Sequence, residues 1–135
     1  MLDELGFYEA ASEHLARHSE LASYRLSCRI DPRLRDWRSK QDAMLFRLLQ
    51  EALLNIQKHA QASAVEVALE PHGSEVLLSI ADDGLGFEPD QVPIGHYGLM
   101  TMRERAEAAG GHLTVEAGSG RRGTRVEVRL PRNEP

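Results

Sequence analysis

Polar residues recur at helical spacing in the middle of the chain. Glu51, Asn55 and His59 are each four residues apart, with Lys58 beside them, inside a segment whose apolar residues predict a helix over residues 41–60. Asparagine is a mediocre helix former, so its place in mid-helix needs a reason. Glutamate and asparagine one turn apart offer two oxygen ligands for a hard cation such as magnesium, or one base and one ligand. The residues alone leave open an ordinary solvated face with a Glu to Lys-type pairing.

A second stretch, IADDGLGF over residues 80–87, sets two carboxylates beside two glycines. Gly84 and Gly86 would let a ligand approach the backbone closely, but Asp82 and Asp83 would repel a phosphate. The stretch also lacks the alternating acidic positions and the later glutamate of a calcium loop. It follows a predicted strand, and the residues alone leave open a simple turn that its aspartates cap.

The segment after this turn is expected to form a loop followed by a helix. The stretch FEPDQVPI between Gly86 and Gly95 has two prolines and no periodicity, which predicts a mobile loop. A helix is then expected to begin at about Gly98, and the free N–H groups at its start could receive a phosphate. Because glycine is common at helix starts, this feature alone does not identify a ligand.

Periodicity along the whole chain predicts the elements that must position these residues. Helical spacing indicates helices over residues 7–23, 41–60 and 99–111, the last one stopped by Gly110 and Gly111. Alternation indicates strands over residues 24–30, 64–70, 75–81, 112–117 and 124–131, with a turn at Gly73. Two consecutive hairpin-like pairs favour an α+β fold with a mostly antiparallel sheet and helices on one face. We expect one domain over residues 1–135.

Composition excludes several classes of protein. The formal net charge of −5 argues against a protein that mainly grips nucleic acid. No apolar run approaches the roughly 18 residues of a membrane span, and the beginning of the chain lacks the pattern of a signal peptide. The single Cys28 cannot form an internal disulfide. These features indicate a soluble, cytoplasmic domain that makes no contact with a membrane.

Four motifs in this order resemble the catalytic ATP-binding domain of bacterial sensor histidine kinases. QEALLNIQKHAQAS looks like the asparagine box of that family, DDGLGF its first glycine box, GHYGLMTMRERAEAAGG its second, and GSGRRGTRVEVRLP its closing strand. The sequences of these motifs are most similar to those of the nitrate-sensor-like subfamily. The resemblance implies a Bergerat-type two-layer α/β sandwich that binds ATP and magnesium.

The resemblance also implies which residues meet the nucleobase. Asp82 would accept a hydrogen bond from the adenine amino group, while Gly84 and Gly86 give the backbone and the base room to approach. Thr124 would close the pocket near the adenine and Asp82. Asp83 would be a turn residue that many small polar side chains could replace.

The resemblance also implies that the polar residues of the helix over residues 41–60 bind the phosphates and the magnesium. Asn55 would bind the magnesium that bridges the phosphates, and Glu51 would be the carboxylate that acts as base or supports the metal. Lys58 and His59 would reach phosphate oxygens. The lid hinge and the helix start that face the phosphates would be formed by Gly95, Gly98 and Leu99.

The residue that receives the phosphoryl group is expected outside this chain. The subfamily phosphorylates a histidine followed by an acidic residue, and none of the six histidines fits, since they precede Leu15, Ser19, Ala60, Gly73, Tyr97 and Leu113. The expected partners are therefore a dimerisation and histidine-phosphotransfer domain of the same kinase and a downstream response regulator. Two alternatives stay open: a stand-alone anti-sigma-factor serine kinase of the same fold, and a pseudo-enzyme that acts through nucleotide or protein contacts without phosphoryl transfer.

Overall fold

A computed structural model describes residues 2–84, 96–117 and 123–132 of the chain. The elements in chain order are α1 (Leu2–Leu21), β1 (Arg25–Ile30), the 3₁₀ turn η1 (Pro32–Leu34), α2 (Asp42–Asn55), the π-helical segment η2 (Ile56–Ala60), β2 (Ala64–His72), β3 (Glu75–Asp82), α3 (His96–Ala108), β4 (His112–Ala117) and β5 (Thr124–Pro131). The predicted strands and helices are all present, with shifts of a few residues at their ends. The predicted mobile loop after Gly86 lies outside the described residues.

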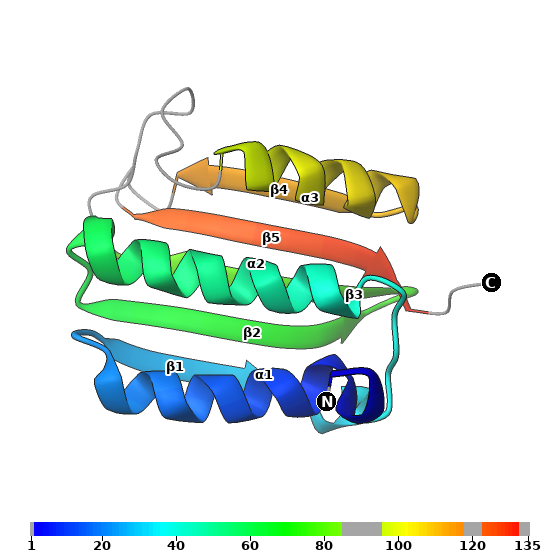
Figure 1. Cartoon of the computed structure of the whole chain (residues 1–135), viewed down its shortest axis with the longest axis horizontal. Helices are drawn as coiled ribbons and strands as arrows, with labels where there is room; N and C mark the ends of the chain where they lie inside the picture. Colours follow the sequence, from blue (N-terminus) through cyan, green and yellow to red (C-terminus); the bar gives the residue numbers. More distant parts are fainter. Residues whose placement is uncertain (1, 85–95, 118–122, 133–135) are drawn as a thin grey trace.

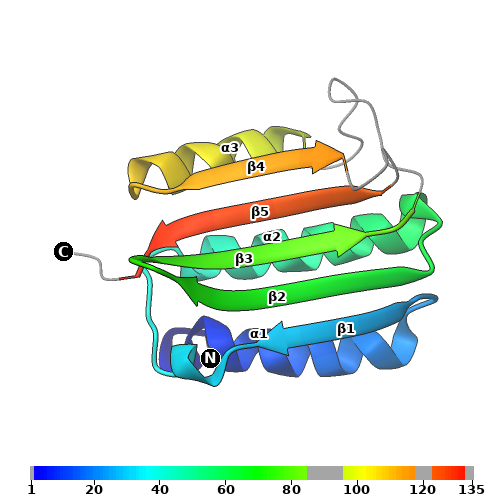
Figure 2. The same ribbon diagram turned by 180° about the vertical axis from the view of Figure 1, so that it is seen from behind.

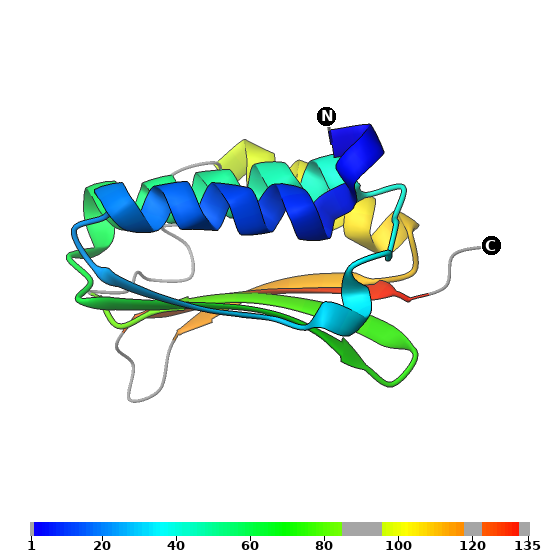
Figure 3. The ribbon, with the colours of Figure 1, turned by 90° about the horizontal axis from the view of Figure 1, so that it is seen from below.

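The strands form one mixed sheet in the order β1-β2-β3-β5-β4 (Figures 1 and 2). β1 runs parallel to β2, whereas β2 with β3, β3 with β5, and β4 with β5 pair antiparallel. Viewed along the sheet, α1, α2 and α3 all lie on one face of it (Figure 3). The two-layer α+β sandwich with a mostly antiparallel sheet is therefore confirmed.

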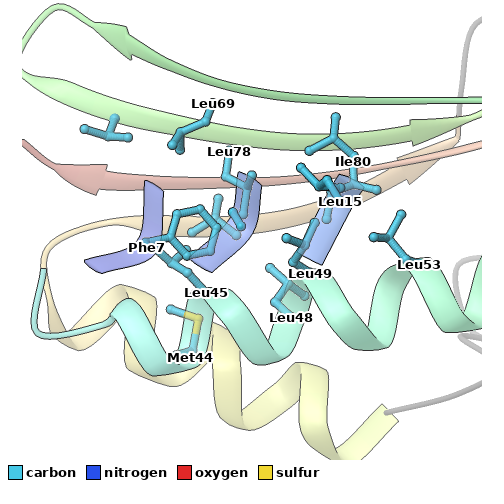
Figure 4. Close-up of a cluster of buried hydrophobic side chains, with 14 of the residues drawn as sticks. Phe7, Leu15, Met44, Leu45, Leu48, Leu49, Leu53, Leu69, Leu78 and Ile80 are labelled. Atoms are coloured by element: carbon cyan, nitrogen blue, oxygen red, sulfur yellow. The ribbon is translucent and has the colours of Figure 1, made fainter. Parts of the chain in front are cut away.

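The core lies between the helices and the inner face of the sheet. Alternate residues of each strand point inward, so that Leu69, Leu78 and Ile80 are almost wholly buried. They meet the apolar stripe of α2, including Leu49 and Leu53, which lie toward the sheet in Figure 4. Burying a leucine of this kind contributes about 2 kcal/mol. This packing fixes the rotation of α2 about its axis, and with it the side on which the polar stripe lies.

The helix ends explain most differences from the predicted boundaries. Gly6 has φ +77° and breaks α1 into two pieces, so the longer piece begins at Phe7, as the apolar stripe predicts. The helix predicted over residues 41–60 changes from α to π geometry after Asn55. A π turn holds more residues than an α turn. The α-helical spacing that would align His59 with Asn55 therefore does not extend through this segment.

The third helix begins earlier than predicted and ends as predicted. α3 starts at His96, so that Gly98 lies inside its first turn instead of at its entry. At the other end Gly110 has φ +86°, its N–H donates to the carbonyl of Glu107, and the N–H of Gly111 donates to the carbonyl of Ala106. These two bonds form a Schellman motif, which ends the helix and turns the chain into β4.

Candidate functional site

Three element ends that carry predicted site residues meet at one end of the molecule. The last turn of α2, the end of β3 and the start of β5 lie together at the left of Figure 1. Register brings Asp82 and Thr124 directly opposite each other as Cα partners at the ends of β3 and β5. The fold thus gathers residues that are far apart in the sequence, since Asn55 lies 69 positions and Asp82 lies 42 positions before Thr124.

Asp82 is a half-buried carboxylate at the inner face of the sheet. It lies two residues after the buried Ile80, so both side chains point toward the helical layer. One carboxylate oxygen accepts a hydrogen bond from the backbone N–H of Gly84 at 2.8 Å. Burial raises the pKa of Asp82, and the charge of Asp83 adds to this, whereas the backbone N–H groups of Gly84 and Thr124 oppose it. The carboxylate is thus placed where a further hydrogen-bond donor from a ligand would stabilise its charged form.

Asp83 points away from that position and holds the strands together. Its carboxylate accepts from the backbone N–H of Ser63 at 2.8 Å, from the Ser63 hydroxyl at 2.6 Å and from the N–H of Ala64 at 3.0 Å. These bonds hold the pKa of the Asp83 carboxyl at about 2, below its ordinary range. Asp83 is therefore more than the replaceable turn residue that the sequence suggests, because it ties the start of β2 to the end of β3.

Glycines allow the backbones to touch beside Asp82. The N–H of Gly123 donates to the carbonyl of Gly84 at 2.9 Å, and Gly123 has φ +76°. A Cβ on Gly123 would lie 1.9 Å from the carbonyl oxygen of Asp82. Gly123 was missed by the sequence reasoning, although its place directly before Thr124 in the closing glycine-rich motif was an available signal. The buried Gly84 lies beside Asp82 as expected.

On α2, Asn55 carries an unsatisfied buried oxygen. Among the described residues, its Oδ1 is the one buried side-chain nitrogen or oxygen without a hydrogen-bond partner. A buried amide oxygen in that condition costs about 1–3 kcal/mol. An amide oxygen is a suitable ligand for magnesium, so the donor present fits the predicted metal. Metal binding would therefore explain why an asparagine, a mediocre helix former, stands at this position of the helix.

Glu51, one turn earlier, is engaged by another side chain. It accepts from Arg47 Nε at 3.1 Å, four residues before it on the same helix, with both side chains partly exposed. This pairing matches the solvated-face alternative for Glu51, with arginine in place of lysine. A catalytic role would require Glu51 to exchange this partner for another group.

The other predicted residues occupy less defined positions. Lys58 is exposed in η2, and His59 belongs to the same segment, but its side chain lies outside the described residues. Gly98 and Leu99 lie in the first turn of α3. Gly86 and Gly95 lie outside the described residues. No group of three or more histidine, cysteine, aspartate or glutamate side chains that could hold a metal occurs in the part of the chain that the structure describes.

Comparison with known proteins gives consistent matches. Residues 40–134 match the family described as histidine kinase-, DNA gyrase B-, and HSP90-like ATPase. Curated relatives include sensor histidine kinase LiaS of Bacillus subtilis (45% identity; 64% of this chain, 24% of the relative) and the histidine-protein kinase/phosphatase UhpB of Salmonella typhimurium (41%; 96% and 25%). The nitrate/nitrite sensor protein NarQ of Escherichia coli is 40% identical over 79% of this chain and 19% of its own length. The chain thus spans a quarter or less of these relatives.

Solved structures share the fold. The mycobacterial sensor histidine kinase MprB superposes with a TM-score of 0.69 at 21% identity, covering 94% of this chain and 95% of that one. The blue-light activated histidine kinase of Erythrobacter litoralis gives a TM-score of 0.71 at 21% identity, over 90% of this chain and 40% of that one. No described helix has the length and apolar character needed to cross a membrane.

Proposed function

Because this chain belongs to the histidine kinase-, DNA gyrase B-, and HSP90-like ATPase family, we propose that it binds ATP with magnesium as the catalytic domain of a sensor histidine kinase. Its similarity to NarQ and UhpB agrees with the nitrate-sensor-like subfamily. In that role the domain donates the γ-phosphoryl group to a histidine on a separate dimerisation domain. The observation that carries the proposal is the half-buried Asp82 carboxylate, set between Gly84 and Thr124.

The adenine is read by the end of β3. Asp82 accepts a hydrogen bond from the exocyclic amino group, which supplies the donor that a partly buried carboxylate needs. Gly84, with Gly86, leaves room for the base, and Thr124 lies next to Asp82 across the ladder. Because a carboxylate is an acceptor only, this site selects a base with an amino group at that position.

The phosphates are met from the helical side. Asn55 Oδ1 would hold magnesium, which would supply positive charge to neutralise the phosphates. Glu51 would release Arg47 and act as base or as a support for the metal. Lys58 and His59, which belong to η2, would reach phosphate oxygens. The remaining proposed contacts are the lid hinge and helix start, at Gly95, Gly98 and Leu99.

The proposal extends to the partners of the domain. A single catalytic domain over residues 1–135 would work in the cytoplasm, where ATP is available. Its acceptor would be the dimerisation and phosphotransfer domain of the same kinase, and a response regulator would take the phosphoryl group in turn. Neither nucleic acid nor a membrane is a proposed partner of the domain itself.

Calorimetric titration with the non-hydrolysable analogue AMPPNP tests the proposal. We expect Asp82→Asn to weaken binding by about 10–100-fold, the range for losing a hydrogen bond to a charged group. Asn55→Ala should weaken binding by at least about tenfold in magnesium and little in EDTA. Asp36→Asn, in an exposed turn at the other end of the molecule, is the matched control and should bind as wild type does. Unchanged affinity in Asp82→Asn would remove the adenine role of that residue.

A further inference from the structure

Tyr24, which is not one of the predicted site residues, forms a hydrogen bond with the last turn of α2. The residue directly precedes β1, and only 6% of it is exposed. Its hydroxyl donates to the backbone carbonyl of Leu53 at 3.3 Å, across 29 residues of sequence. Leu53 lies two residues before Asn55 on α2, so this bond ends beside the proposed magnesium ligand.

A second bond fastens the same turn. The backbone N–H of Ser23 donates to the side-chain oxygen Oε1 of Gln57 at 3.2 Å. Leu53 and Gln57 are one turn apart on either side of Asn55. Two adjacent residues before β1 therefore hold the helix on both sides of Asn55.

The helix changes its geometry at this place. The N–H of Ile56 is shared between the carbonyls of Ala52 and Leu53, and the π-helical segment η2 begins at Ile56. π turns are rare, and they occur frequently at functional sites. Since Leu53 accepts both from this shared N–H and from Tyr24, the tyrosine acts where α geometry gives way to π geometry.

The Tyr24 hydroxyl is oriented by His18. Nε2 of His18 lies within hydrogen-bond distance of the hydroxyl oxygen, and the two rings are 5.7 Å apart between centroids. A hydroxyl has one proton, so in the arrangement in which Tyr24 donates to Leu53, the neutral tautomer of His18 that carries its proton on Nε2 is the donor to Tyr24. His14 stacks on His18 at 6.1 Å and contacts the ring of Phe46 at 5.6 Å, which limits the movement of the imidazole.

We propose that Tyr24 is a positioning residue, oriented by His18, that holds the last turn of α2 so that the Asn55 side-chain oxygen meets the magnesium of the bound nucleotide. The inference rests on the proposed function, and no direct contact of Tyr24 with the nucleotide is part of it. Burial, followed by the negative charge of Asp82, raises the pKa of Tyr24 to about 12, so the hydroxyl keeps its proton at physiological pH. It therefore remains a donor throughout the working range.

The test compares AMPPNP affinity in magnesium with affinity in EDTA, using the full 135-residue chain. Their ratio measures the magnesium-dependent part of binding, which a general loss of structure would not change selectively. We expect Tyr24→Phe to lower the ratio about fivefold, the effect of losing one hydrogen bond, with affinity in EDTA within about twofold of wild type. Tyr8→Phe is the matched control, since Tyr8 packs under Arg35 in another part of the fold, and it should leave the ratio unchanged.

A second pair of variants covers the case in which Tyr24→Phe does not fold. His18→Leu removes the donor to Tyr24 and should lower the ratio, whereas His18→Gln retains an N–H donor and should restore most of it. Equal ratios in wild type, Tyr24→Phe and His18→Leu would overturn the inference, as would equal weakening in magnesium and in EDTA. If Asn55→Ala leaves the ratio unchanged, the proposed magnesium role itself fails. If only Asn55→Ala lowers it, the positioning role alone is overturned.

Discussion

At the scale of single residues, two identical neighbours have opposite environments. Asp82 and Asp83 are adjacent, yet burial raises the pKa of Asp82 while hydrogen bonds from Ser63 and Ala64 lower that of Asp83. Asp82 ends β3 on the face toward the helices, whereas Asp83, just beyond the strand, turns to Ser63 and Ala64. One carboxylate is therefore costly to the fold and available to a ligand, and the other stabilises the fold and is already occupied.

This division predicts a pH-dependent role for Asp83. A carboxyl whose pKa folding lowers stabilises the folded state above its ordinary value near 3.8, and that stability is lost as the pH falls toward about 2. Asp83→Asn should therefore lower Tm by about 3 °C at neutral pH, and the difference from wild type should narrow below about pH 4. Thermal unfolding followed by circular dichroism across this pH range measures it. A constant difference at every pH, or AMPPNP affinity as low as that of Asp82→Asn, would contradict the assignment.

At the scale of elements, glycines set how closely the backbones approach. A Cβ at Gly111 would lie 1.9 Å from the carbonyl oxygen of Arg129, where the end of α3 turns into β4 against β5. Gly123 makes the same close approach to Asp82. The closest overlap is the same at the two positions, although Gly123 also has φ +76°, and only Gly123 adjoins the proposed site.

These two glycines therefore form a matched pair of variants. Gly111→Ala and Gly123→Ala should each destabilise the domain by about 3 kcal/mol, since backbone must move to relieve the overlap. Only Gly123→Ala displaces Asp82, so it alone should weaken AMPPNP binding, by about tenfold, at a temperature where both variants are folded. Urea denaturation and calorimetry measure the two effects. Equal nucleotide affinity in the two variants would show that the backbone at Gly123 does not position Asp82.

Sequence periodicity predicted the elements well because each repeats over many neighbouring residues. The apolar stripe of α2, the alternation of β2 and the glycine cap of α3 are local signals of this kind. The features that were missed depend on contacts between distant residues. The bond from Tyr24 to Leu53 has no local signature, and the glycine-rich motif that contains Gly123 does not reveal its contact with Asp82. The π-helical segment was also missed, because the apolar spacing over residues 41–60 predicts a continuous α-helix.

At the scale of the whole molecule, the topology brings the proposed ligand-binding residues together at one end of the sandwich. β3 and β5 are neighbours although β4 lies between them in the chain, so the ends that carry Asp82 and Thr124 meet beneath the last turn of α2 (Figure 1). The base contacts then come from the sheet, and the metal contact comes from the helical layer. A nucleotide bound there would span the two layers.

The domain should therefore transfer phosphate to a separate domain of the kinase and not to itself. None of its six histidines precedes an acidic residue. The chain covers a quarter or less of the length of each relative, so we expect the acceptor in another part of the kinase. Incubated with labelled ATP, magnesium and the dimerisation domain of its own kinase, the chain should label that domain and remain unlabelled. The label should be acid-labile and base-stable, as for phosphohistidine. Asn55→Ala should reduce the rate at least about tenfold, and Asp36→Asn should not. An acid-stable label on serine would favour the anti-sigma-factor kinase alternative, and nucleotide binding with no transfer would favour the pseudo-enzyme.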